Sequence, residues 1–306
     1  MYKASVVIIT YKHEEFISQA INGVLMQQCD FPVELIIGND NSPDRTDEII
    51  KDIIESYSGN IKIRYDNHAQ NLGMIPNFIS SLKKATGEYI AICEGDDYWT
   101  DPFKLQRQVN FLEDKQEYSL IAENSLVINT INGNQYNFND IDECDINLTD
   151  LLVKRQFSTA STSFRSKYLD NDFYQVAYSG DTFLWCYLAT KGKIKYLNII
   201  SSVYTRGLQG IVESTSKIKW AKMMEIWNKN ISQILPSGYD RKILKERNYN
   251  EFSAVFLVST EEKNIRYALF SLLKCFRYQP LKTVKMIIVL SFERLKHLNI
   301  LSNGRS

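Results

Sequence analysis

Three carboxylates stand within four residues of one another: Glu94, Asp96 and Asp97. They follow residues 89–93, an apolar run that predicts a buried strand. Because carboxylates this close repel one another, the cluster is costly unless a cation or ligand compensates its charge. Hard cations such as Mg²⁺ and Mn²⁺ prefer oxygen ligands and bridge to substrate phosphates. The spacing therefore predicts a divalent-cation site, with an acidic surface turn as the alternative interpretation.

Two other polar segments stand where predicted strands end. Thr10 and Tyr11 close the β-branched run at 5–11, and Asp40 closes a second run at 33–40. In open α/β sheets, ligands bind outside the carboxyl ends of the strands. We therefore expect these two segments to meet the acid cluster at one edge of a sheet.

The three segments together offer the contacts that a nucleoside diphosphate needs. The Asp40 carboxylate can accept a hydrogen bond from a ring N–H such as that of uracil, and Tyr11 can stack on the base. A cation at Asp97 can hold the diphosphate. Each segment also has an ordinary interpretation, because the Asn-Ser-Pro-Asp sequence at 41–44 is typical of turns and helix caps. Taken jointly, they predict a nucleoside diphosphate pocket.

Two further candidates lie later in the chain. Asp181 begins a predicted helix at 180–191, where an acid either caps the helix or serves as a general base. The helix start favours the ionised carboxylate, which suits a base that must accept a proton. Arg206 follows a predicted strand at 194–204 and can neutralise a leaving diphosphate, although a surface arginine is the alternative.

The elements that must position these residues change in type along the chain. Up to residue 116 strands and helices alternate four times, which predicts a parallel sheet with helices on both faces. Beyond it the predicted elements are strands at 120–130, 158–164 and 194–204, a hairpin turn at 132–134, a polar loop at 137–150 and a helix at 180–191. From Lys217 the pattern is helical. We predict a catalytic domain at 1–215, with halves at 1–116 and 117–215, and a helical extension at 216–306.

The ordered motifs resemble the family 2 glycosyltransferases, whose fold is called GT-A. The resemblance covers about residues 4–115, with a weaker similarity at 180–206. The matching segments are Ser-Val-Val-Ile-Ile-Thr-Tyr at 5–11, Asn-Asp-Asn-Ser-Pro-Asp-Arg-Thr at 39–46, Asn-Leu-Gly at 71–73, Ala-Thr-Gly-Glu-Tyr-Ile at 85–90 and Glu-Gly-Asp-Asp-Tyr-Trp-Thr-Asp-Pro-Phe-Lys-Leu at 94–105. Several motifs in order are far more specific than one.

The resemblance implies an inverting transfer of a sugar from a nucleotide donor to an acceptor hydroxyl, with Mn²⁺ or Mg²⁺ as cofactor. It implies that Asp40 contacts the nucleobase, Asp96 the ribose or donor sugar, and Asp97 the metal. It implies that Asp181 is the general base. The acceptor would be a glycan or a lipid-linked saccharide, in bacterial cell-surface polysaccharide synthesis, and no nucleic-acid partner is expected.

The chain departs from the family pattern at three places. Asn39 replaces the first of two acids that often end the second strand. Glu94 stands in place of the first aspartate of the Asp-x-Asp element and is one methylene longer. The arginine that often follows the Asn-x-Gly loop is missing, and Asn77 is carried over in that region as a donor contact. The rival to an enzyme is therefore an inactive carbohydrate- or partner-binding descendant. A dehydrogenase or pyrophosphorylase is disfavoured, because the loop at 12–15 has no glycine.

Charge and cysteine content bear on location and partners. Residues 1–215 carry 19 Lys and Arg against 29 Asp and Glu, whereas residues 216–306 carry 17 against 7. The five cysteines are scattered and include no Cys-x-x-Cys, which favours free thiols in a cytoplasmic protein. Basic and apolar residues interleave over 281–298, as in helices that lie on the inner face of a membrane. A helix packed on the catalytic domain is the alternative.

Overall fold

The computed structural model describes residues 2–170, 173–174, 180–207 and 215–303, with side chains up to residue 291. The chain divides into two compact units, residues 1–213 and 214–306, and the predicted boundary after residue 215 lies two residues away.

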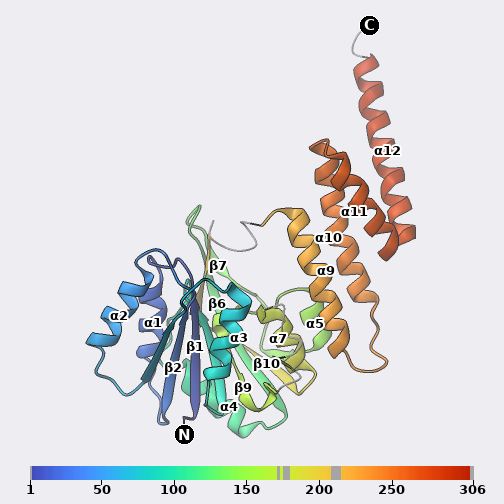
Figure 1. Ribbon diagram of the computed structural model, residues 1–306. Coiled ribbons are helices and arrows are strands. Elements are labelled where there is room, and N and C mark those ends of the chain that lie inside the picture. Colours follow the sequence, from blue (N-terminus) through green and yellow to red (C-terminus); the bar gives the residue numbers. More distant parts are fainter. Residues whose placement is uncertain (1, 171–172, 175–179, 208–214, 304–306) are drawn as a thin grey trace. The chain divides into compact units, whose positions relative to one another are not determined.

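The first unit is built on one mixed sheet (Figure 1), in the order β3-β2-β1-β4-β9-β6-β10-β5. Six of these strands run parallel: β1 (Ala4–Thr10), β2 (Val33–Asn39), β3 (Lys62–Asn67), β4 (Tyr89–Glu94), β6 (Tyr118–Asn129) and β10 (Lys193–Arg206). The antiparallel strands are β5 (Tyr98–Trp99), β7 (Gln135–Asn137), β8 (Cys144–Ile146) and β9 (Thr162–Arg165). Because the six parallel strands share one direction, their carboxyl ends lie at one edge of the sheet.

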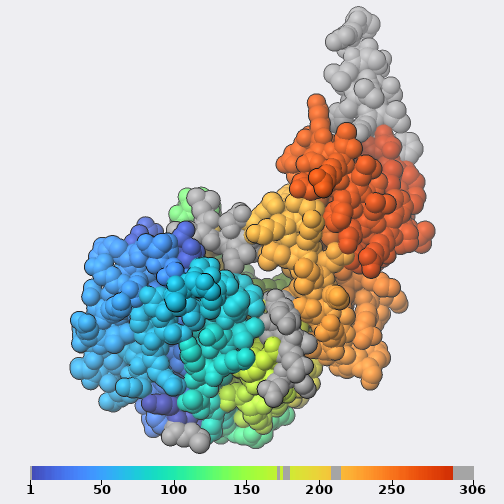
Figure 2. Space-filling view, in the orientation of Figure 1, coloured from blue at the N-terminus to red at the C-terminus, as the bar shows by residue number. Residues whose placement is uncertain are grey.

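Helices cover both faces of the sheet, as the alternation of strands and helices predicted. On one face lie α1 (Ile17–Leu25), α2 (Thr46–Ser56) and α4 (Lys104–Asp114), whose apolar sides pack on β1, β2 and β4 in one core. On the other face lie α3 (Met74–Lys84), which packs on β1 and β2, and α7 (Gly180–Ala189), which contacts α3 and β6. In Figure 2 the cyan atoms of α3 cover the strands that Figure 1 shows behind it.

Two predicted segments differ from the structure. The strand predicted at 158–164 begins with a 3₁₀ turn at Thr159–Ser161, and only Thr162–Arg165 is a strand. The Ser161 and Thr162 hydroxyls donate to the carbonyls of the residues three before them, and such local bonds compete with strand pairing. The loop predicted at 137–150 contains β8 and the start of α5 (Leu148–Val153), whose capping box joins Asn147 and Asp150.

A lysine is buried under the sheet. Lys104 lies with its Nζ 4.1 Å from the centroid of the Trp99 ring and donates to Gln108 at 3.0 Å. Burial lowers the pKa of Lys104 to about 8, from an ordinary value of 10.5. Between these values the unfolded chain holds a proton that the folded chain lacks, so this lysine makes the free energy of unfolding rise with pH.

Lys104→Met is therefore expected to stabilise the protein at pH 7, by up to about 3 kcal/mol, because it removes the cost of burying the charge. The Gln108 Oε1 keeps a partner, since Ser163 donates to it at 2.6 Å. Denaturant unfolding at pH 7 and pH 10 measures the effect. The gain should shrink at the higher pH; a variant that is less stable than the wild type at both would contradict the assignment.

The second unit is helical, as predicted from Lys217 onward. It consists of α9 (Lys217–Ile234), α10 (Lys242–Glu261), α11 (Ile265–Tyr278) and α12 (Pro280–Asn303). Ala221, Phe252, Val255 and Cys275 form its small core. Within the described residues, none of the helices combines the length and the apolar character needed to cross a bilayer.

Candidate active site

The carboxyl ends of the parallel strands meet through their backbones. The Asp40 N–H donates to the Thr10 carbonyl at 3.0 Å, which joins the end of β2 to the end of β1. The Gly95 N–H donates to the Ile9 carbonyl at 2.9 Å, which joins β4 to β1. A Cβ on Gly95 would come within 2.7 Å of the Thr10 side chain, so only glycine permits this approach. The structure thus brings the segments at 10–11, 40 and 94–97 together.

Asp97 lies at the centre of this edge and is 1% exposed. Its Oδ1 accepts a hydrogen bond from the Thr205 N–H of β10 at 2.8 Å, whereas its Oδ2 is buried and has no hydrogen-bond partner among the described residues. Burial, together with the neighbouring Asp96 and Glu94 charges, raises the pKa of Asp97 well above its usual range. A buried carboxylate oxygen without a partner is what a cation would satisfy.

The described residues contain no group of three or more His, Cys, Asp or Glu side chains able to hold a metal. Asp97 would therefore be the protein's main ligand, and a cation would take its other oxygens from a diphosphate and water, as Mg²⁺ commonly does. The residues around Asp97 therefore fit a cation that binds together with a substrate diphosphate.

Asp181 forms an ion pair that no pattern in the sequence indicated. Its Oδ2 accepts from the Arg155 guanidinium at 2.8 Å and from the Thr159 hydroxyl at 2.8 Å, and its Oδ1 accepts from the Thr182 N–H at 2.6 Å. Burial alone would raise the pKa of Asp181, but Arg155 and these hydrogen bonds lower it. Asp181 is therefore held ionised at the start of α7.

Arg155 links the two groups of acids. Besides its bond to Asp181, its charge interacts with Glu94 and Asp97, and its guanidinium lies 5.4 Å from the Tyr204 ring centroid. Burial raises the pKa of Glu94 to about 8, and the Asp181 and Asp96 charges add to this shift. Arg155 is the cation that offsets these carboxylates. Its only signal in the sequence is a Lys-Arg pair before a Ser/Thr-rich segment, which is not specific.

Asp40 organises the loop at 71–73. It is 2% exposed, and its two carboxylate oxygens accept the backbone N–H groups of Leu72 at 2.7 Å and Gly73 at 2.8 Å. Gly73 has a φ of 91°, in the region that favours glycine. An ionised carboxylate has about four acceptor positions, so Asp40 can still accept one bond from a base.

Asn77, which was predicted to contact the donor, makes two hydrogen bonds within the fold. Asn77 is 2% exposed; its amide donates to the Gly38 carbonyl at 2.9 Å, and its Oδ1 lies 3.0 Å from the His68 Nε2. It lies on the face of α3 that packs on β2, so its polar atoms are used within the fold. Asn77 therefore supports the sheet edge, and its contact with a donor stays a prediction.

The remaining candidates line the edge. Thr10 is buried, with its Oγ1 3.2 Å from the His13 Nδ1, and the His13 Nε2 lies 4.0 Å from an Asp96 oxygen. Tyr11 is 38% exposed, and Arg206 is exposed with a nitrogen 3.4 Å from the Tyr136 hydroxyl. His13 therefore lies between Thr10 and Asp96.

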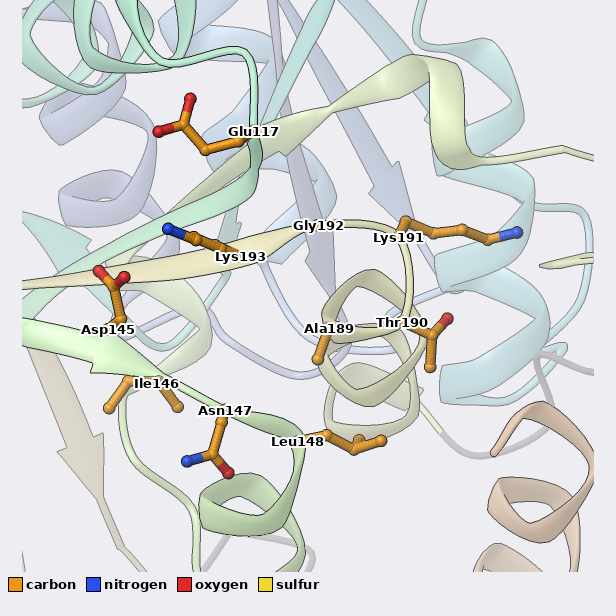
Figure 3. Close-up of a pocket in the computed structure, with 10 residues that line it drawn as sticks. All are labelled: Glu117, Asp145, Ile146, Asn147, Leu148, Ala189, Thr190, Lys191, Gly192 and Lys193. Carbon is orange, nitrogen blue, oxygen red and sulfur yellow. The ribbon is translucent and has the colours of Figure 1, made fainter. Parts of the chain in front are cut away.

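Two hollows lie at opposite edges of the sheet. One of about 270 Å³ is bounded by the segments that follow β1 and β2; it is lined by Lys12, Glu14, Glu15, Phe16, Pro43 and Asp44. The other, of about 580 Å³, lies where β6 and β10 begin, between Glu117, Asp145 and Lys193 (Figure 3). The larger hollow is therefore at the wrong edge to serve the acid cluster.

Comparisons with known proteins agree with this architecture. The family model described as Glycosyl transferase family 2 matches residues 5–166. An uncharacterized protein of Mycobacterium tuberculosis is 34% identical over 211 residues, which are 69% of this chain and 60% of that protein. The chain thus matches less than two thirds of the length of this relative.

Two solved structures share the fold. The S. aureus protein TarS in complex with UDP-GlcNAc aligns with a TM-score of 0.68 at 17% identity, over 92% of this chain and 82% of that one. The mannosyltransferase PcManGT of Pyrobaculum calidifontis, in complex with GDP-Man and Mn²⁺, aligns with a TM-score of 0.55 at 15% identity, over 96% and 81%. At these identities the likeness concerns the fold alone.

A mixed sheet covered by helices on both faces, with acids at its carboxyl edge, defines an α/β domain of the GT-A class. The chain belongs to glycosyl transferase family 2.

Proposed function

We propose that this chain is an inverting glycosyltransferase that uses a nucleotide-diphosphate donor, a UDP-sugar first, and a divalent cation. The observation that carries the proposal is the buried Oδ2 of Asp97 at the carboxyl edge of the sheet, which finds no hydrogen-bond partner in the part of the chain that the structure describes. The ligands named for the similar structures, UDP-GlcNAc for one and GDP-Man with Mn²⁺ for the other, support a nucleotide donor and a cation. The acceptor would be a hydroxyl of a glycan or of a lipid-linked saccharide.

In this proposal each residue at the edge has one task. Tyr11 and Asp40 bind the base, Thr10 and His13 support Asp96 against the ribose or sugar, and Asp97 holds Mn²⁺ or Mg²⁺. The bound cation supplies positive charge to the diphosphate. Exposed Arg206 follows Thr205, whose N–H binds Asp97, and in this proposal it neutralises the leaving group.

The transfer step needs one proton acceptor. The acceptor hydroxyl attacks the anomeric carbon from the side opposite the diphosphate, its proton passes to the Asp181 Oδ, and the bond from the anomeric carbon to the diphosphate oxygen breaks with its electron pair on the diphosphate. Arg155 keeps Asp181 ionised before this step. We place the reaction in cell-surface polysaccharide synthesis on the cytoplasmic side of the membrane.

A thermal-shift panel of nucleotides and nucleotide sugars tests the donor class. A UDP-sugar at 100 times its Kd should stabilise the fold by about 2.7 kcal/mol, and only when Mn²⁺ is present. Stabilisation by adenine nucleotides alone, or equal stabilisation in EDTA, would contradict the proposal.

Arg155→Gln is expected to shift the pH dependence of the reaction. Because Arg155 lowers the pKa of Asp181, its removal raises that pKa, so a higher pH is needed to keep the base ionised. The acid limb of the kcat/KM profile should move upward in pH, with a larger loss of activity at pH 6 than at pH 8. Arg107→Gln is the control, since Arg107 pairs with Asp101 and Glu123 away from the edge and should leave the limb in place. An unmoved limb in Arg155→Gln would refute the role.

The alternative is an inactive protein that binds a carbohydrate or a partner on the same fold. It requires no ionised base, whereas Asp181 is held ionised by Arg155 and Thr159. That arrangement favours the enzyme.

A further inference from the structure

One face of α11 exposes large apolar side chains. Ile265 is 73% exposed, Leu269 58%, Leu273 71% and Phe276 37%. Their spacing of four, four and three residues places them in one stripe along the helix. The opposite side of α11 is buried: Ser271 and Cys275 are 0% exposed, and Cys275 belongs to the core of this unit. The helix is thus already packed, and the stripe is a second apolar surface that the core does not use.

The next helix repeats the pattern. On α12, Leu281 is 83% exposed, Val284 45% and Ile288 48%, at a spacing of three and four residues. These three belong to the stripe that the sequence predicted over 281–298; the side chains beyond residue 291 lie outside the described part. Exposed apolar stripes on two successive helices are unusual for a surface that only meets water.

The charges around the stripe all have one sign. Residues 265–291 contain five Lys and Arg, among them Lys285, and no Asp or Glu. Two exposed arginines of α11, Arg266 and Arg277, directly follow the stripe residues Ile265 and Phe276 in the sequence. Because successive residues of an α-helix are rotated by about 100° around its axis, both arginines border the stripe on the same side. Lys274 and Lys282, by contrast, pair with Glu225 and Glu246 of the same unit.

We propose that this face of α11 docks on a membrane surface that contains anionic lipids. The apolar stripe enters the boundary between headgroups and acyl chains, and the Arg266 and Arg277 guanidiniums contact lipid phosphates. A second copy of the chain fits the face poorly. A two-fold contact between two such stripes brings cations against cations, with no acid in 265–291 to pair with them. The docking does not depend on the proposed transfer reaction, although a lipid-linked acceptor would lie at the same surface.

Co-sedimentation of the full chain with vesicles tests the proposal. At low salt the wild type should sediment with phosphatidylcholine–phosphatidylglycerol vesicles and remain in the supernatant with phosphatidylcholine alone, and binding should fall as salt is raised. The double variant Leu269→Ser with Leu273→Ser removes apolar area, and Arg266→Glu with Arg277→Glu reverses the charge. Each should weaken partitioning by about tenfold or more.

Ile226→Ser is the matched control, because Ile226 is 57% exposed in the same unit but lies on α9. It should sediment like the wild type. The proposal is overturned if the wild type fails to bind anionic vesicles at low salt, or if the leucine variant binds them as well as the wild type. It is also overturned if the leucine variant instead converts a dimer to a monomer in size-exclusion chromatography, because the face would then bind a second copy. Nucleotide binding, measured on the same variants, should not change.

Discussion

Asp97→Asn is expected to abolish the cation-dependent binding of UDP, with a loss in affinity of about 100-fold or more in the presence of Mn²⁺. The carboxylate is the buried group whose Oδ2 has no partner among the described residues, so it is the group that a cation bound with the diphosphate would neutralise. An amide keeps the size of the side chain but is a poor ligand for a hard cation. Calorimetric titration of UDP with Mn²⁺, and again with EDTA, measures the effect.

The same substitution should leave the fold intact without metal. The Thr205 N–H can still donate to the amide oxygen, and the repulsion from Asp96 and Glu94 is removed, so the melting temperature of the metal-free variant should equal or exceed that of the wild type. Asp145→Asn is the control, because Asp145 lies by the hollow at the opposite edge of the sheet. An Asp97→Asn protein that binds UDP with wild-type affinity and Mn²⁺ dependence would show that the cation is held elsewhere.

Asp181→Asn is expected to reduce turnover by about 100-fold or more while UDP affinity changes little. An amide cannot take the proton of the attacking hydroxyl, but it can still accept hydrogen bonds from Thr159 and Thr182. Steady-state kinetics and a separate UDP titration distinguish the two effects, because a base acts in the chemical step and not in donor binding.

Asp150→Asn provides the comparison, since Asp150 is an acid in the first turn of a helix that closes a capping box on α5. Its substitution should cost about 1 kcal/mol of stability and no turnover. If Asp181→Asn behaves like Asp150→Asn, then Asp181 is a helix cap and the base has to be sought elsewhere.

The position of the candidate site follows from local sequence patterns. Each β-branched run ends in polar residues, and the handedness and direction of parallel strands bring such ends to one edge. This is why the sequence alone could place Thr10, Asp40 and the acids at 94–97 together. The predicted GT-A fold, with a mostly parallel sheet and a helical extension, is confirmed for the same reason.

Contacts between residues far apart in the chain were beyond such patterns. Arg155 meets Asp181 across 26 residues, and a carboxylate at a helix start gives no sign of the cation that faces it. The burial of Asn77 depends on which side of α3 packs on β2, and Asn77 lies in the very segment where a donor contact was expected. The position of β9 between β4 and β6 is also a long-range contact. The pattern of apolar residues in a four-residue strand does not predict which strands it pairs with.

The most direct test of the proposed transferase is the release of nucleoside diphosphate from a panel of nucleotide sugars, with Mn²⁺ and with glycan and lipid-linked acceptors. We expect nucleoside diphosphate to be released from one donor class. With an acceptor present, the release should be faster than the slow hydrolysis of the donor alone. The release should be lost in EDTA and in Asp181→Asn. Tight, Mn²⁺-dependent binding of a nucleotide sugar with no release, equal in the wild type and in Asp181→Asn across the panel, would contradict the enzyme and support the inactive binding protein.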